Sequence, residues 1–165
     1  WGDARQKISE IENSLIFDLI LLDPFSPQKC PELWSKQFIS LLASRLSLDG
    51  RLITYSSAAS IRASFIKAGL KIYSIIPSID NQNKWSSGTV AMKKKLEKQF
   101  ISRNCQLKDL SNREMEHLTT RSSIPYRDPT GKGSSEKIIL TRKIEQSKSQ
   151  LINTSSWRKK WNTAQ

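Results

Sequence analysis

Residues 17–34 of this 165-residue chain read FDLILLDPFSPQKCPELW. The first six are a mostly apolar run that ends at Asp23-Pro24, which is typical of a strand buried on both faces, as in a parallel sheet. The loop that follows contains three prolines, and each fixes φ and removes backbone freedom. Ligands bind outside the carboxyl ends of strands in open α/β sheets, so this loop predicts a ligand site in which Asp23 is presented rigidly.

Downstream, the apolar residues alternate between helical and strand periods. The expected helices run from Trp34 to a turn at Asp49-Gly50, and from a Ser56-Ser57 cap to Gly69. The expected strands span residues 51–55, 71–76 and 88–92. This order predicts the α/β class, namely the second half of an open sheet with parallel strands. The final strand should be antiparallel, because its connection is too short for a crossover helix.

Charge divides the chain into two parts. Residues 1–92 hold ten Lys/Arg and eight Asp/Glu, whereas residues 93–165 hold seventeen and seven, so the second part carries +10 of the net +12. We expect 1–92 to be the C-terminal part of a sheet domain that lacks its N-terminal half, and to leave one apolar edge strand uncovered. We expect 93–165 to be a basic, partly helical extension. Its charge favours a polyanionic partner, and a merely solvated tail is the alternative.

Within the extension, a capping box at Ser111–Glu114 predicts a helix to about Thr120, with Met115 and Leu118 facing inward. A second helix is expected over 135–151, after an ordered loop that either contacts RNA or packs against the domain. Trp157 and Trp161 would share one helical face, which either stacks RNA bases or docks the tail on the sheet.

Several classes of protein are disfavoured. No run approaches eighteen apolar residues, so we expect no membrane span. Cys30 and Cys105 lie far apart, and His117 has no second ligand at metal-binding spacing. We therefore expect no metal, reduced thiols, a cytoplasmic protein, and an ordinary surface or cap role for His117.

The loop after Leu22 resembles the signature Asp-x-Phe-[Ala/Ser]-Pro-x-Lys-x-Pro-[Asp/Glu]-x-Trp of the MnmC-like tRNA methyltransferases, which finish 5-methylaminomethyl-2-thiouridine at the tRNA wobble position. The matching residues are Asp23, Phe25, Ser26, Pro27, Lys29, Pro31, Glu32 and Trp34. Gly2-Asp3-Ala4 is similar to the family's adenine-binding turn, and Ser57-Ala58 with Arg62 to a later element. The likeness covers about residues 1–92 and departs at Pro24, where the family commonly has Gly. The family's glycine-rich turn, which holds the methionine moiety of the cofactor, and the acidic residue that holds its ribose have no counterpart in residues 1–92, so we expect the glycine-rich N-terminal half of the domain to be missing.

The resemblance implies a Rossmann-like, S-adenosylmethionine-dependent methyltransferase that acts on the aminomethyl group of a tRNA wobble uridine, without a flavin domain. It implies that Asp23 is the catalytic residue and orients the substrate amine. The implied cofactor contacts are Asp3, Ala4, Asp23, Pro24 and Phe25. The implied substrate contacts are Phe25, Ser26, Pro27, Lys29, Ser57 and Arg62. Two alternatives stay open: a non-catalytic basic RNA-binding module, and a related methyltransferase for another amine.

Overall fold

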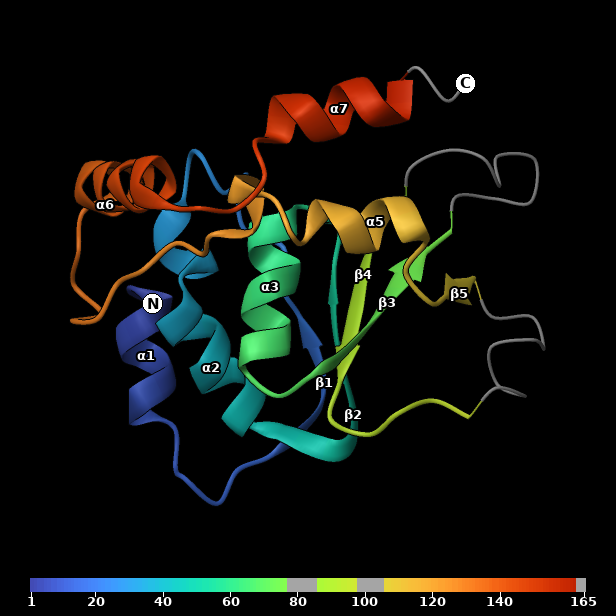
Figure 1. Ribbon diagram of the computed structural model, residues 1–165. Coiled ribbons are helices and arrows are strands. Elements are labelled where there is room, and N and C mark those ends of the chain that lie inside the picture. The colour runs from blue at the N-terminus through green and yellow to red at the C-terminus, as the bar shows by residue number, and fades with distance from the viewer. Residues whose placement is uncertain (77–85, 98–105, 163–165) are drawn as a thin grey trace.

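The computed structural model describes residues 1–76, 86–97 and 106–162 as a mixed α/β fold (Figure 1). The helices are α1 Ala4–Glu10, α2 Lys36–Ser44, α3 Ala59–Lys67, α5 Asn112–His117, α6 Ser135–Lys148 and α7 Thr154–Asn162, with short 3-10 helices η1 Pro31–Trp34 and η3 Arg121–Ser123. The strands are β1 Phe17–Leu21, β2 Leu46–Thr54, β3 Lys71–Ile75, β4 Gly88–Met92 and β5 Leu107–Lys108.

The five strands form one sheet in the order β1-β2-β4-β3-β5. β1 and β2 are parallel, whereas β4 runs antiparallel to both of its neighbours, β2 and β3. The predicted antiparallel final pair is therefore confirmed. β4 lies between the two strands that α3 connects: Val90 pairs with Ile53 on one side and with Tyr73 on the other.

The turn predicted at Asp49-Gly50 is wrong. α2 ends at Ser44, and β2 starts at Leu46, which pairs with Phe17. The register then shifts, so residues 47–50 form an irregularity inside the strand. Gly50 is needed there, because an added Cβ would lie 3.0 Å from the Phe17 carbonyl oxygen. The polar pair that resembles a helix stop is a bulge against β1.

The prediction that β1 is buried on both faces is also wrong. β1 is an edge strand of the described sheet, and only β2 pairs with it. Leu19 and Leu21 are 54% and 68% exposed, because no described element covers their face. Ile20 and Leu22 point the other way and belong to the main core. The expectation of an uncovered apolar edge strand is confirmed for the part of the chain that the structure describes.

The start of α3 differs from the prediction, but its end does not. Ala58, not Ser56-Ser57, occupies the N-cap position. Ser56 lies two residues earlier, and its hydroxyl accepts a hydrogen bond from the Ala58 N–H at 3.4 Å. Gly69 follows the helix at φ 82°, the left-handed conformation that glycine adopts without strain.

The core lies between the sheet and the helix pair α2 and α3 (Figure 1). Its largest fully buried apolar side chains are Trp34, Phe65, Ile39, Leu46, Leu52, Ile61 and Ile138. Ile138 comes from α6, so the extension contributes to the same core as the sheet. No helix in the described ranges is long and apolar enough to span a membrane.

The capping box predicted in the extension is confirmed at α5, where Ser111 and Glu114 exchange hydrogen bonds. Met115, which was predicted to face inward, is 52% exposed, and Glu114 is buried instead. Glu114 occupies the inward position of α5 because it pairs with the buried Arg62.

Candidate functional site

The loop that follows β1 presents an exposed carboxylate at the carboxyl end of the strand. Asp23 lies two residues beyond β1, and its side chain faces solvent. Two aromatic side chains hold the adjacent backbone: Tyr55 donates its hydroxyl to the Pro24 carbonyl at 2.9 Å, and Trp34 donates its indole N–H to the Phe25 carbonyl at 2.7 Å. The Trp34 and Tyr55 rings meet edge to face, with centroids 5.9 Å apart. Asp23 is therefore accessible, and its loop is fixed.

The other loop residues expected to touch ligands gather in the same exposed segment. Phe25 is 77% exposed, which is unusual for a phenylalanine and leaves its ring available. Pro24 and Pro27 are half-buried, and Ser26 and Lys29 are exposed. The Ser26 carbonyl accepts hydrogen bonds from the backbone N–H groups of Lys29 and Cys30, at 2.8 and 3.0 Å, so this part of the loop is a closed turn.

Asp3 and Ala4 lie at the start of α1. Asp3 is the N-cap residue and accepts hydrogen bonds from the Arg5 N–H at 2.9 Å and from the Arg5 guanidinium at 2.6 Å. These bonds lower the pKa of Asp3, so it is ionised at neutral pH. Its side chain is 32% exposed, and Ala4 is exposed beside it. The two residues can still meet a ligand from the solvent side.

Arg62 is not where a substrate contact requires it to be. It is 1% exposed and forms an ion pair of 2.8 Å with Glu114. Its guanidinium also donates to the hydroxyls of Thr89, Ser74 and Ser86 at 3.0, 3.1 and 2.8 Å. These partners enclose the side chain, because a buried charge must be paired and hydrogen-bonded. Arg62 thus joins α3, the sheet and α5, and we exclude it from the residues that touch substrate.

The carboxylate of this pair is strongly held. Burial alone would raise the pKa of Glu114, but the Ser111 N–H and the Arg62 guanidinium outweigh burial and lower it to about 2. Burial also lowers the pKa of Arg62, yet a guanidinium stays protonated under any ordinary condition. Both members of the pair are therefore charged, and they form a buried ion pair between the sheet and α5.

A cavity of about 650 Å³ opens beyond the carboxyl end of β2, next to the Asp23 loop. It is lined by Tyr55, Ser56, Ser57, Ala58, Arg113, His117, Trp157, Arg158 and Asn162. Ser57, expected from the sequence as a substrate contact, is among them. Tyr55 belongs to both features, since its hydroxyl bonds the loop and its ring lines the cavity. The site thus combines an acidic loop with a basic, aromatic wall.

Sequence reasoning missed His117. It is half-buried and stacks on Trp157, with ring centroids 4.2 Å apart and an interplanar angle of 16°. Burial and the nearby Arg62 and Arg158 guanidiniums lower its pKa to about 4. A signal was present: Arg113 and His117 are four residues apart within the predicted helix, which puts them on one face.

The two tryptophans of α7 dock this helix on α5. Trp157 is 7% exposed, and its indole N–H donates to the Arg113 carbonyl at 3.3 Å. The Trp161 N–H donates to Glu116 at 3.0 Å. Of the two roles considered, docking is therefore observed for Trp157, although the surface it meets is α5 rather than the sheet. The face of its ring is taken by His117 and is not offered to a base.

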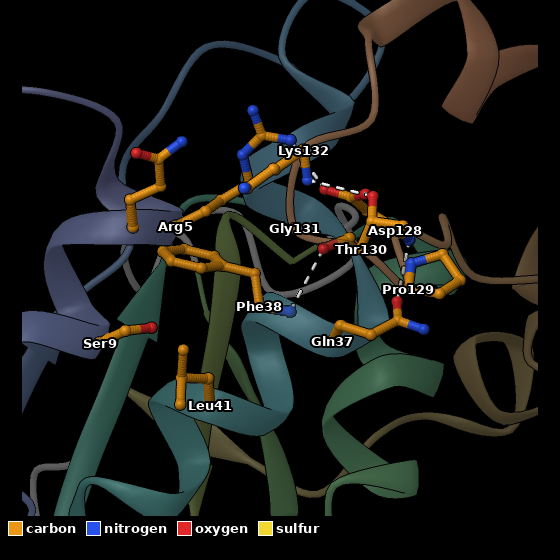
Figure 2. A pocket seen from close by; sticks show the side chains of 12 residues that line it. Arg5, Ser9, Gln37, Phe38, Leu41, Asp128, Pro129, Thr130, Gly131 and Lys132 are labelled. Carbon is orange, nitrogen blue, oxygen red and sulfur yellow. Dashed lines mark hydrogen bonds and ion pairs between the residues drawn. The ribbon is translucent and has the colours of Figure 1, made fainter.

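A second cavity, of about 440 Å³, lies between α1, α2 and the loop 128–132 (Figure 2). Arg5 donates to the Asp128 carboxylate at 2.7 Å, and Gln37 accepts the Asp128 N–H at 2.9 Å. Figure 2 shows these side chains converging on Asp128 from both helices. The Arg5–Asp128 ion pair and the Gln37 bond tie α1, α2 and this loop together around the cavity.

The groups beyond β1 fit one side of a site for S-adenosylmethionine. An accessible carboxylate and an exposed aromatic ring, Asp23 and Phe25, both attract a cationic centre. Asp3 adds an acceptor for an amino group. Among the described residues, no group of three or more His, Cys, Asp or Glu could hold a metal ion.

Comparison with known proteins agrees with this chemistry. A family model for S-adenosyl-L-methionine-dependent methyltransferases matches residues 1–91. The chain is 38% identical over 72 residues, 44% of its length, to the tRNA 5-methylaminomethyl-2-thiouridine biosynthesis bifunctional protein MnmC of Azoarcus sp., and covers 11% of that protein. An uncharacterized protein of Methanocaldococcus jannaschii is 27% identical over 150 residues, which is 89% of this chain and 38% of that protein.

The fold also resembles a solved structure. The crystal structure of MNMC2 from Aquifex aeolicus superposes with a TM-score of 0.77 at 29% identity, over 90% of this chain and 44% of that one. The structural similarity therefore continues past residue 91, where the family model ends, into the basic extension. The chain spans less than half the length of each of these relatives.

Proposed function

Because this chain belongs to the S-adenosyl-L-methionine-dependent methyltransferase family, whose model matches residues 1–91, we propose that the protein methylates the aminomethyl group of a tRNA wobble uridine. The observation that carries the proposal is the exposed Asp23 in a loop fixed at two successive carbonyls. The names of the MnmC relatives, which refer to tRNA 5-methylaminomethyl-2-thiouridine biosynthesis, supply the acceptor.

When bound, the cofactor supplies an electrophilic methyl group on a sulfonium. Asp23 accepts a hydrogen bond from the substrate amine and points its lone pair along the direction of transfer. Alignment of this kind can provide much of the rate gain, since no covalent enzyme intermediate is needed. A carboxylate also favours the protonated ammonium, so Asp23 orients the amine first and accepts its proton second.

The remaining contacts divide between the two ligands. We assign Asp3 to the adenine amino group, Ala4 to the adenine ring, and Pro24 and Phe25 to the cofactor side of the loop. On the substrate side we assign Phe25, Ser26, Pro27, Lys29 and Ser57. Arg62 is not assigned to either ligand, because it is buried and paired with Glu114.

The test is methyl transfer by the full-length protein to tRNA that carries an aminomethyl-uridine. Asp23→Asn keeps the shape of the side chain and removes its charge, and Asp23→Ala removes both. Both should lower kcat by about a hundredfold or more, because a misdirected nucleophile costs about that factor. Asp49→Asn is the matched control, since Asp49 lies in the β2 bulge and makes only an exposed pair with Lys94. Near-normal turnover by both Asp23 variants removes Asp23 from the mechanism.

A second candidate is a non-catalytic RNA-binding module, and the +10 charge of residues 93–165 favours it. Calorimetric titration of the full-length protein with S-adenosylmethionine separates the two. Saturable binding supports the enzyme, whereas salt-dependent RNA affinity without any cofactor isotherm supports the module. Turnover on a different amine, with none on tRNA, would point to a related methyltransferase.

A further inference from the structure

The cavity beyond β2 is built by three segments that lie far apart in the sequence. The turn 55–58 forms one wall, α5 contributes Arg113 and His117, and α7 contributes Trp157 and Arg158. Figure 1 shows α7 lying over α5, beyond the ends of the strands. The family model ends at residue 91, so α5 and α7 lie outside the part that defines the family.

The charge on the cavity wall is positive. Burial lowers the pKa of His117 to about 4, and the charges of Arg62, Arg158 and Arg113 add to this shift. His117 is consequently neutral at physiological pH and gives the wall an uncharged hydrogen-bonding group. The nearby acids are already paired, because Glu114 binds Arg62 and Glu116 binds Lys160.

From this arrangement we propose that the cavity between α5, α7 and the turn after β2 binds the sugar-phosphate backbone of single-stranded RNA, next to the acceptor nucleotide. The choice of RNA rests on the proposed function, which places a polynucleotide at the adjacent Asp23 loop. Guanidinium groups bind phosphate in a bidentate manner, and the Ser57 hydroxyl and His117 imidazole suit a ribose hydroxyl. The volume of about 650 Å³ is within the usual range of roughly 300–1,000 Å³ for ligand sites.

The aromatic side chains determine which part of the RNA binds here. Trp157 is 7% exposed and stacked on His117, so no base can stack on it. Tyr55 is 46% exposed and lies between the cavity and the Pro24 carbonyl. The cavity therefore binds the RNA sugar-phosphate backbone through its positive charges. The exposed Tyr55 lies between this bound backbone and the Asp23 loop.

Arg158→Ala in the full-length protein tests the proposal, because Arg158 is exposed and its loss should not disturb the fold. Bulk tRNA and a single-stranded oligouridylate serve as probes, titrated by fluorescence anisotropy at several salt concentrations. We expect about tenfold weaker binding of both RNAs, and a slope of log affinity against log salt that is shallower by about one. Arg158→Lys should restore part of the affinity.

Lys148→Ala is the matched control, since Lys148 is an exposed cation at the end of α6, outside the cavity. Equal affinity of Arg158→Ala and the wild type at all salt concentrations overturns the proposal, and so does an equal loss in Lys148→Ala. Tight binding of poly-glutamate that Arg158→Ala abolishes, with RNA binding unaffected, overturns it in favour of an acidic protein partner. A separate result would contradict only the proposed function. If the wild-type protein binds RNA through Arg158 but does not methylate tRNA, the proposed reaction is wrong and the RNA site stands.

Discussion

At the scale of single residues, His117 acquires its chemistry from the neighbours that enclose it. It stacks on Trp157, and burial together with the Arg62 and Arg158 guanidiniums lowers its pKa from 6.5 to about 4. The Glu114 carboxylate opposes this shift, but burial and the neighbouring guanidiniums outweigh it. The imidazole is therefore neutral at the physiological pH at which RNA would bind. Its protonation would add a third positive charge to the cavity wall, beside those of Arg113 and Arg158.

We predict that the imidazole of His117 titrates with a midpoint near pH 4 in the folded chain, and near 6.5 in urea. The unfolded state binds this proton at higher pH than the folded state, so the free energy of unfolding should fall as pH drops from about 6.5 to about 4. His117 is the only histidine of the chain, so one NMR resonance reports it directly. A folded-state midpoint near 6.5 would contradict the buried, stacked placement.

At the scale of elements, α7 depends on its tryptophan contacts. It is nine residues long, and isolated helices shorter than about 12–15 residues are marginal in water. Trp157 supplies the only buried side chain among its described residues, and Trp161 adds a hydrogen bond to Glu116. The helix should exist only while it is docked on α5.

We therefore predict that Trp157→Ala releases α7 without unfolding the sheet. In hydrogen exchange, the amides of 154–162 should approach unprotected rates, while those of β2 and β4 stay protected. Trp161→Phe keeps an apolar ring and removes one hydrogen bond, so it should cost about 1 kcal/mol or less and leave α7 protected. Equal exchange of α7 in Trp157→Ala and wild type would show that other contacts hold the helix.

Elements governed by local sequence could be predicted, and those governed by distant partners could not. The capping box at Ser111 and the Gly69 stop are local signals, and both are confirmed. The Asp49-Gly50 pair has the local appearance of a turn, but Phe17, about thirty residues away, makes it a bulge. In the site, the Asp23 loop was readable because its residues are contiguous. The cavity was not, because α7 reaches it only through the packing of the extension.

At the scale of the whole molecule, the sheet and the extension share their buried polar groups. Arg62 pairs with Glu114, and Arg5 pairs with Asp128, each across more than fifty residues of sequence. The Lys36 N–H also donates to the Tyr126 carbonyl at 2.9 Å, so the loop 121–133 packs against α2 as one of its two expected roles required. The division at residue 92 stays a prediction from charge, and these contacts indicate that the two parts unfold together.

Variants of the Arg5–Asp128 pair allow the coupling between the two parts to be measured as a change in unfolding free energy. Asp128 has a side chain 1% exposed, whereas Arg5 keeps a second partner in Asp3. Arg5→Met therefore leaves a buried charge and should cost about 3–5 kcal/mol of unfolding free energy. Asp128→Asn leaves no orphaned charge and should cost about 1–3 kcal/mol. Removing both should cost less than the sum, by about 0.5–3 kcal/mol.

Urea unfolding of the two single variants and the double variant measures this cycle. Arg127→Met is the control: Arg127 makes an exposed pair with Glu145 and should contribute about 1 kcal/mol or less. Strict additivity of the Arg5 and Asp128 changes would mean that this ion pair does not couple the two parts. We expect the double variant to lose less unfolding free energy than the sum of the two single variants, with a single cooperative transition in every case. Because Arg5 bonds both Asp3 and Asp128, this result would mean that the extension fixes the turn that we assign to adenine. Cofactor affinity should then weaken in Asp128→Asn, although Asp128 is not among the residues that we assign to the cofactor.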